Sequence, residues 1–273
     1  MGKREYCPED LFIIRMLLYL GHSRQVVREY VQDPSLVQQL QEFQRQNIYL
    51  AQEYDKLRQT IAAREIHSFE DLQRHDQRGV EALIHLASQT SALQLGNGRS
   101  FGFFGITSTG KSTMINKLIG SDLAKTGAGE TTTQITPYDG SDYRLYDIPG
   151  RNDDITYFSM EYVAFWKALT ARVVLITTTV KEMTKVFRLL DAINLRYNIV
   201  VNKFDLVPYN ERDTFKQQVQ NQIRECGLRG VEHVWYISAH NPRQFPDWIA
   251  MVDSLTITFN ENRSVTHAYV LSS

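Results

Sequence analysis

The chain is poor in cysteine, carries little net charge and lacks any long hydrophobic run. Cys7 and Cys226 are its two cysteines; they lie far apart and outside any metal-binding spacing, which predicts a reduced, cytoplasmic setting. The formal net charge is −1, so no general nucleic-acid-binding surface is expected. No secretory signal or membrane-spanning run is present, and membrane attachment is expected to be peripheral at most.

A glycine-rich loop is the first feature that points to chemistry. Gly105 and Gly110 bracket four residues, and Lys111 and Ser112 follow directly. Apolar residues before the loop predict a strand, and those after it have helical spacing, which is the context of a phosphate-binding loop. Backbone N–H groups and the helix N-terminus would hold phosphate, Lys111 would reach the β- and γ-phosphates, and Ser112 would bind Mg²⁺. The residues expected at the nucleotide phosphates are Gly105, Ser108, Thr109, Gly110, Lys111, Ser112 and Thr113.

Two further motifs predict groups that sense the γ-phosphate. Three consecutive threonines end a polar loop, and we expect Thr132 to contact Mg²⁺ and the γ-phosphate, with Thr131 and Thr133 as alternatives. A predicted strand then leads into Asp147-Ile-Pro-Gly150. Asp147 would hold Mg²⁺ through a water, and the Gly150 N–H would bind the γ-phosphate. Lys111, Thr132 and Gly150 are thus the expected catalytic residues, and Ser112, Thr132 and Asp147 the expected metal-binding residues.

The last two motifs predict recognition of guanine. An apolar strand ends in Asn202-Lys203-Phe204-Asp205, and the Asp205 carboxylate would accept two hydrogen bonds from the guanine N1–H and 2-amino group. Adenine offers no such pair of donors, so discrimination can be large. Lys203 would lie on the base, and Asn202 would brace the loops. After the next strand come Ser238 and Ala239, whose backbone N–H would donate to guanine O6.

In order and spacing, these motifs resemble those of the P-loop GTPases of the Ras-like, translation-factor-related class. The resemblance covers residues 99–259, and the run GAGETTTQITPY followed by DIPG looks like the immunity-related and 50S-ribosome-binding types. It implies binding of GTP and GDP, hydrolysis of GTP to GDP and phosphate with Mg²⁺, and a nucleotide-dependent switch. The chain lacks the large C-terminal helical region of the immunity-related members, so their membrane-attacking role is not expected.

One residue departs from the pattern that the resemblance implies for hydrolysis. Arg151 stands where Ras-like enzymes carry the glutamine that orients the attacking water. Three interpretations stay open: hydrolysis is slow, a partner or second copy supplies the missing group, or a monovalent cation beside Ser108 assists. We favour the second interpretation, in which the protein dimerises when nucleotide is bound. An effector is also expected, but the sequence does not identify it.

The remaining pattern predicts an α/β fold with two regions. A doubly wound, mostly parallel, six-stranded G domain is expected over residues 99–260, with one antiparallel edge strand, a helical region over 1–98 and a tail over 261–273. Strands are expected near 100–104, 134–139, 143–147, 172–178, 197–201 and 233–237, and helices near 111–120, 154–169, 182–195, 210–226 and 245–257.

The N-terminal region predicts two short helices, Glu9–Leu20 and Ser23–Gln32, and then two long ones. Ser35 with Gln38 forms an apparent capping box that opens a helix to about Ile61, and the other long helix is expected over about Phe69–Leu95. The first long helix carries a heptad seam with Asn47 at an a-type position: Leu36, Leu40, Phe43, Asn47, Leu50, Tyr54, Leu57 and Ile61.

Two arrangements of this region stay open. The seam could pair between chains as a coiled coil, or the two long helices could form an antiparallel hairpin on the G domain. The turn residues His67-Ser68 favour the hairpin, and Gly96–Gly98 is the expected hinge. The seam also keeps a second function open, that of a helical scaffold whose G domain binds nucleotide with little turnover.

Overall fold

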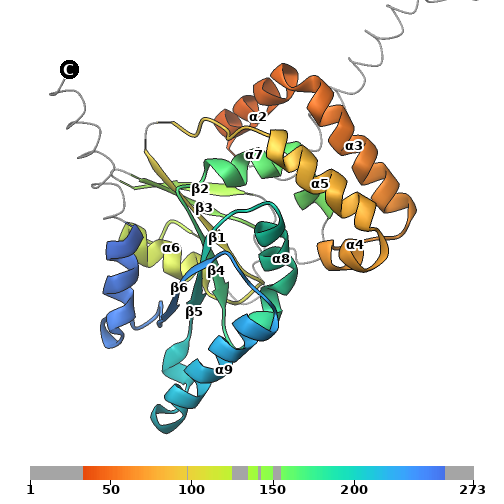
Figure 1. Cartoon of the computed structure of the whole chain (residues 1–273). Coiled ribbons are helices and arrows are strands. Elements are labelled where there is room, and N and C mark those ends of the chain that lie inside the picture. Colours follow the sequence, from red (N-terminus) through yellow and green to blue (C-terminus); the bar gives the residue numbers. More distant parts are fainter. Residues whose placement is uncertain (1–32, 97, 125–134, 141–142, 150–154, 256–273) are drawn as a thin grey trace, which may run out of the picture.

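A six-stranded sheet forms the centre of the protein in the computed structural model, which describes residues 33–96, 98–124, 135–140, 143–149 and 155–255 (Figure 1). The strand order is β2-β3-β1-β4-β5-β6, and only the pairing of β2 with β3 is antiparallel. This confirms the predicted doubly wound, mostly parallel sheet and its antiparallel edge. The strands are β1 (Arg99–Phe104), β2 (Thr136–Asp139), β3 (Tyr143–Asp147), β4 (Ala171–Ile176), β5 (Tyr197–Val201) and β6 (Val231–Tyr236).

Helices cover both faces of the sheet, which is why its central strands are apolar on both sides. All five residues of β5 are buried, as are five of the six in β4. One face packs against α6 (Lys111–Ile119) and a helix over residues 246–255. The other face packs against α7 (Met160–Ala168), α8 (Thr184–Ala192) and α9 (Arg212–Glu225).

Short 3₁₀ turns divide three of the helices that the sequence predicts as continuous. The expected helix over 154–169 is η1 (Ile155–Phe158) and then α7, because Ser159 caps α7 by accepting from the Tyr162 N–H at 3.3 Å. In the same way η2 (Val180–Met183) precedes α8, and η4 (Tyr209–Glu211) precedes α9. The remaining 3₁₀ turns are η3 (Phe204–Leu206) and η5 (Pro242–Gln244).

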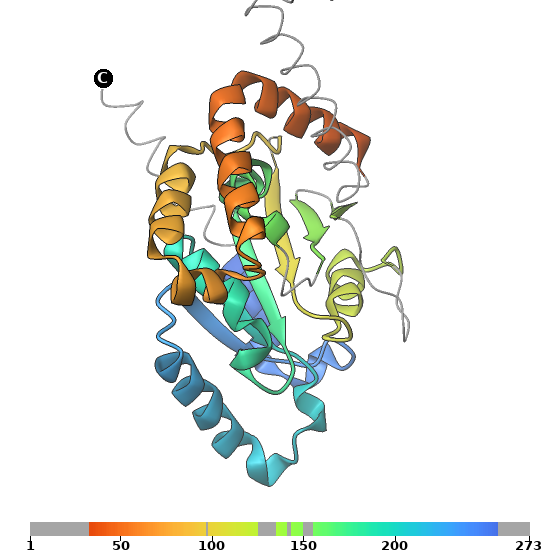
Figure 2. The same ribbon diagram turned by 90° about the vertical axis from the view of Figure 1, so that its right-hand side faces the viewer.

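A second layer of helices lies over α7 and α8. It consists of α2 (Pro34–Gln46), α3 (Ile48–Ala63), α4 (Phe69–His75) and α5 (Gln77–Gln89). The view at right angles shows these helices, coloured orange, at the end of the molecule opposite to α9 (Figure 2). We call them the helical layer. The helices α3 and α5 pack side by side, with the turn at His67-Ser68 between α3 and α4.

The predicted long helix with a heptad seam is wrong, because the chain breaks at Asn47. The Asn47 side chain donates to the Phe43 carbonyl at 2.8 Å, and its backbone ends α2 before α3 begins. Asparagine favours such local bonds to the backbone over a continuing helix. Asn47 therefore does not set the register of a coiled coil. The seam residues Leu36, Tyr54 and Ile61 are at most 2% exposed within this one chain.

Two further predictions for the N-terminal region need correction. The cap of α2 is Asp33, whose carboxylate accepts from the Ser35 N–H at 2.9 Å, and Pro34 takes the first helical position; Ser35 is not the cap. The predicted helix over 69–95 is split at Asp76, which caps α5 by accepting from the Gly79 N–H at 3.0 Å. The two predicted helices before residue 33 lie outside the described residues.

The helical layer and the sheet share one buried cluster. The Phe69 ring of α4 packs edge to face on Phe158 of η1, with 6.3 Å between ring centroids. Lys167 of α7 donates to the carbonyls of Ala87 and Thr90 at 2.6 and 2.7 Å, which caps the end of α5. Across the described ranges, no helix is both long and apolar enough to cross a bilayer.

We predict that Phe69→Ala lowers the free energy of unfolding of the whole chain by about 3–5 kcal/mol, because it opens a cavity in the shared cluster. Urea denaturation followed by circular dichroism and by tryptophan fluorescence measures this. Tyr49→Ala is the control, since Tyr49 is 74% exposed, and it should change stability by less than about 0.5 kcal/mol. A separate unfolding transition for the helical layer would contradict the prediction.

Candidate functional site

The glycine-rich loop joins the end of β1 to the start of α6, as the sequence predicts. Gly110 has φ +90° at the N-cap of α6, and a Cβ there would lie 2.4 Å from the Asn202 side-chain nitrogen, so only glycine fits without displacing Asn202. Thr109 closes a turn by donating from both its N–H and its hydroxyl to the Ile106 carbonyl. Ser108 is exposed with φ +68°, and Thr113 lies in the first turn of α6. The loop thus has the form of an anion-binding cradle.

Lys111 lies buried in this loop, with 7% of its surface exposed. Its ammonium donates to the Gly105 carbonyl at 2.8 Å and lies 4.0 Å from the Asp147 carboxylate. Burial lowers the pKa of Lys111 below its ordinary value, and the Asp147 charge opposes that shift. A polyphosphate bound in the loop would compensate the desolvated ammonium, as a buried cation requires.

Two oxygen groups suited to a divalent cation lie beside Lys111. The Ser112 hydroxyl donates to Asp147 Oδ2 at 3.3 Å, and Asp147 is 2% exposed at the end of β3. Parallel pairing of β1 and β3 aligns Phe103 with Asp147 and so brings the strand end against the glycine-rich loop. Mg²⁺ prefers oxygen ligands and is commonly held by one or two protein groups together with substrate phosphates. Ser112 and Asp147 fit that role.

Asn202 connects the phosphate side of the site to the base side. Its side-chain nitrogen donates to the Thr109 carbonyl at 2.7 Å, and its side-chain oxygen accepts from the Ala239 N–H at 2.9 Å. Asn202 is 2% exposed at the end of β5. In this structure the Ala239 N–H donates to Asn202. The contact of the same N–H with guanine O6 stays a prediction.

The loop that follows Asn202 is anchored by Phe204. Its ring is 3% exposed and lies among the rings of Phe215, Tyr236 and Phe245, with centroids 5.9, 5.2 and 5.8 Å away. Lys203, just before it, is exposed and has φ +59°, in the left-handed region. Anchoring by the buried ring leaves Lys203 and Asp205 at the rim of the site.

Sequence reasoning missed the partner of Asp205. Asn241 donates from its side chain to Asp205 Oδ2 at 3.3 Å, and its own N–H donates to the Ser238 hydroxyl at 3.1 Å. Ser238 is 1% exposed. The Asn241 side chain therefore orients the carboxylate that is predicted to read the base. The signal available was an asparagine two residues after Ser238-Ala239, a position at which a local side-chain turn is common.

Part of the predicted site lies outside the described residues. These positions are Thr131, Thr132 and Thr133 of the threonine cluster, Gly150 of the second motif, and Arg151. Their roles remain predictions. Within the described parts of the chain, no group of three or more histidine, cysteine, aspartate or glutamate side chains could hold a metal ion.

The fold and the site together define a P-loop nucleotide-binding protein. A glycine-rich loop that contains Lys111 leads from a central parallel strand into a helix, and the Asp147 and Asn202 side chains meet it from the ends of β3 and β5. In open α/β sheets, ligands bind at the carboxyl ends of the strands.

Comparisons with known proteins narrow this class. Residues 100–203 match the family model described as 50S ribosome-binding GTPase. A probable GTP-binding protein EngB of Mycoplasma genitalium is 29% identical over 135 residues, which cover 45% of this chain and 70% of that protein. Its counterpart in Mycoplasmoides gallisepticum is 27% identical over 150 residues, which cover 50% of this chain and 78% of the relative. A crystal structure of a probable GTP-binding protein engB is 18% identical with a TM-score of 0.37, over 56% of this chain and 97% of that one.

Over residues 100–203 the chain is therefore similar to a P-loop GTPase domain. This confirms the resemblance drawn from the motifs.

We predict that Asn202→Ala lowers the free energy of unfolding by about 2–4 kcal/mol, because it leaves the Thr109 carbonyl and the Ala239 N–H buried without their partner. Chemical denaturation without nucleotide measures the change. Asn210→Ala serves as the control, since Asn210 is exposed in η4. Equal stability of the two variants would show that Asn202 does not join the loops.

Proposed function

We propose that this protein binds GTP, hydrolyses it to GDP and phosphate with Mg²⁺, and changes conformation between the two states. One observation carries the proposal. The phosphate loop, the Ser112–Asp147 pair and the base loop converge at one edge of the sheet, and Asn202 links the first of these to the last. The match to the GTPase family supports the same conclusion.

The phosphates would lie against the glycine-rich loop. The loop N–H groups and the Lys111 ammonium would bind the β- and γ-phosphates, and the desolvation of Lys111 makes an anionic ligand favourable. Binding would also draw Lys111 from its bond to the Gly105 carbonyl. A nucleoside triphosphate is the ligand whose length and charge this arrangement suits.

Mg²⁺ would be held by Ser112 and, through a water, by Asp147, with Thr132 as a ligand when GTP is bound. The ion would neutralise charge on the β- and γ-oxygens during transfer of the phosphoryl group to water. The Gly150 N–H would donate a hydrogen bond to the γ-phosphate. Because GDP has no γ-phosphate, hydrolysis would release Thr132 and Gly150 together, and this is the proposed switch.

The base would lie between Lys203 and the loop at Ala239. Asp205, oriented by Asn241, would accept hydrogen bonds from the guanine N1–H and 2-amino group. Adenine would leave the carboxylate without its two donors, a loss that favours guanine.

Arg151 leaves the group that orients the attacking water unassigned. We propose that a second copy of the chain or another partner supplies it, with a monovalent cation at Ser108 as the other source. The apolar residues of the helical layer are already buried against α7 and α8 of the same chain. The dimer that we propose therefore forms through the G domain.

The decisive experiment is phosphate release from GTP across a protein concentration series, with Na⁺ or K⁺ as the monovalent ion. We expect turnover that depends on Mg²⁺ and rises more than linearly with protein concentration. Lys111→Ala should weaken binding of GDP and GTP about a hundredfold or more, because it removes a buried charged partner of the phosphates. Lys117→Ala is the matched control, since Lys117 is exposed on the same helix.

Guanine binding with negligible turnover at every concentration would favour the scaffold function instead. No binding of either nucleotide would contradict the proposal outright. Activation by K⁺ but not by Na⁺, linear in protein concentration, would assign the missing group to the cation.

We predict that Asp205→Asn weakens guanine nucleotide binding about a hundredfold and shifts preference toward xanthine nucleotides, because an amide can donate to the 2-oxo group that xanthine carries. Competition between GDP, XDP and ADP for a fluorescent nucleotide measures the preference. Asp213→Asn, an exposed position on α9, should leave it unchanged. Retained guanine preference in Asp205→Asn would refute the assignment of the base site.

A further inference from the structure

Asp205 lies in the short turn η3, which is held at both of its ends. At the start of the turn, the Phe204 N–H donates to the Ile237 carbonyl at 2.9 Å, directly after β6. At its end, the Val207 carbonyl accepts from Arg212 Nε at 3.2 Å. Arg212 is the first residue of α9 and belongs to none of the predicted motifs. Its side chain therefore fixes the exit of the turn that carries the predicted base-reading carboxylate.

The same guanidinium also contacts a second turn of the base site. It lies over the rings of Phe204 and Phe245, 5.4 and 5.2 Å from their centroids, where the ring faces attract a cation. Phe245 ends the turn η5, and Asn241 begins it. Asn241 is the residue that donates to the Asp205 carboxylate. Arg212 thus touches both the turn that carries Asp205 and the turn that carries its hydrogen-bond partner.

The place of Arg212 in α9 is not explained by the helix itself. A cation at the first position of a helix opposes the helix dipole, so the favourable contacts of this half-buried side chain are those with the two turns. Lys216, one turn further along α9, also lies over Phe204 at 5.8 Å, but it is exposed and its second ring is Tyr236. A guanidinium can donate in its plane while its face lies on a ring, whereas an ammonium acts as a point charge. Of these two cations, Arg212 is the one that reaches both turns.

We propose that Arg212 is a positioning residue for base recognition, which joins the two turns and so holds the Asp205 carboxylate in place for the guanine N1–H and 2-amino group. The inference rests on the proposed function and adds a residue to it. Hypoxanthine has the N1–H but no 2-amino group, so a well-placed carboxylate prefers guanine to hypoxanthine, and a displaced one loses that preference. Arg212 therefore contributes to the ratio of the affinities for GDP and IDP.

The test uses the full chain and Arg212→Met, which keeps the length of the side chain and removes its charge and its donors. Dissociation constants for GDP and IDP are measured with Mg²⁺ by competition against a fluorescent guanine nucleotide. We expect the preference for GDP over IDP to fall about tenfold in Arg212→Met, and Arg212→Lys, which keeps a cation over the rings, to retain part of it. The ratio of the two affinities does not depend on the folded fraction, so a loss of stability alone would leave it unchanged.

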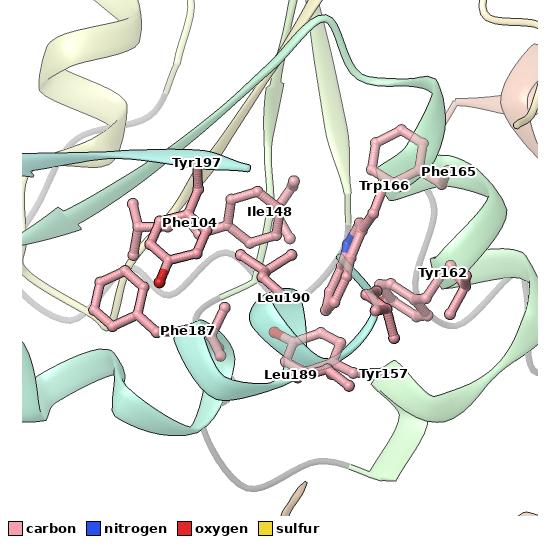
Figure 3. Close-up of a cluster of buried hydrophobic side chains, with 14 of the residues drawn as sticks. Phe104, Ile148, Tyr157, Tyr162, Phe165, Trp166, Phe187, Leu189, Leu190 and Tyr197 are labelled. Atoms are coloured by element: carbon pink, nitrogen blue, oxygen red, sulfur yellow. The ribbon is translucent and has the colours of Figure 1, made fainter. Parts of the chain in front are cut away.

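Two controls separate positioning from stability. Lys216→Met removes the exposed cation over the same ring and should leave the ratio unchanged. Phe187→Leu should lower stability and also leave the ratio unchanged. Figure 3 shows Phe187 of α8 in a buried aromatic cluster, where it stacks on Tyr197, with 5.0 Å between ring centroids, at the opposite end of β5 from Asn202.

The outcomes distinguish this inference from the proposed function. An unchanged ratio in Arg212→Met, or an equal fall in Lys216→Met, would overturn the inference while the parent protein still preferred GDP. Failure of the parent to bind guanine nucleotides, or to prefer GDP to IDP, would instead contradict the proposed base site and the inference with it.

Discussion

The side chain of Asn202 is the contact on which the geometry of the site depends. It donates to the loop after β1 and accepts from the loop after β6, so one buried amide joins two loops that follow different strands of the sheet. Gly110 belongs to the same contact, because any larger residue would occupy the position of the amide nitrogen. Asn202, at the end of β5, therefore ties the glycine-rich loop to the loop at Ala239.

The buried ammonium of Lys111 is the reason to expect an anion at the carboxyl ends of the strands. Lys111 is enclosed at 4.0 Å from Asp147, and its lowered pKa reflects the cost of keeping an ammonium out of water. A single carboxylate at that distance compensates the cost only in part. A bound polyphosphate and a cation between Ser112 and Asp147 would satisfy both charges at once.

The helical layer is a structural part of the domain that contains the site. Its helices bury their apolar faces on α7, α8 and η1. The seam residues are thereby buried within one chain and not in a coiled coil between chains.

Local chemistry determined most of what the sequence revealed. Apolar runs, turn residues and the spacing of glycine, lysine, asparagine and aspartate predicted the sheet, its antiparallel edge and the loops of the site, because each depends on neighbours within a few residues. Only the tertiary structure decided what depends on residues far apart in the chain. It paired the Ala239 N–H with Asn202, placed Asn241 on Asp205 and brought Arg212 over Phe245. The tertiary structure also revealed the helix break at Asn47. The apolar spacing continues through this residue, but its side chain bonds to the Phe43 carbonyl and the helix ends there.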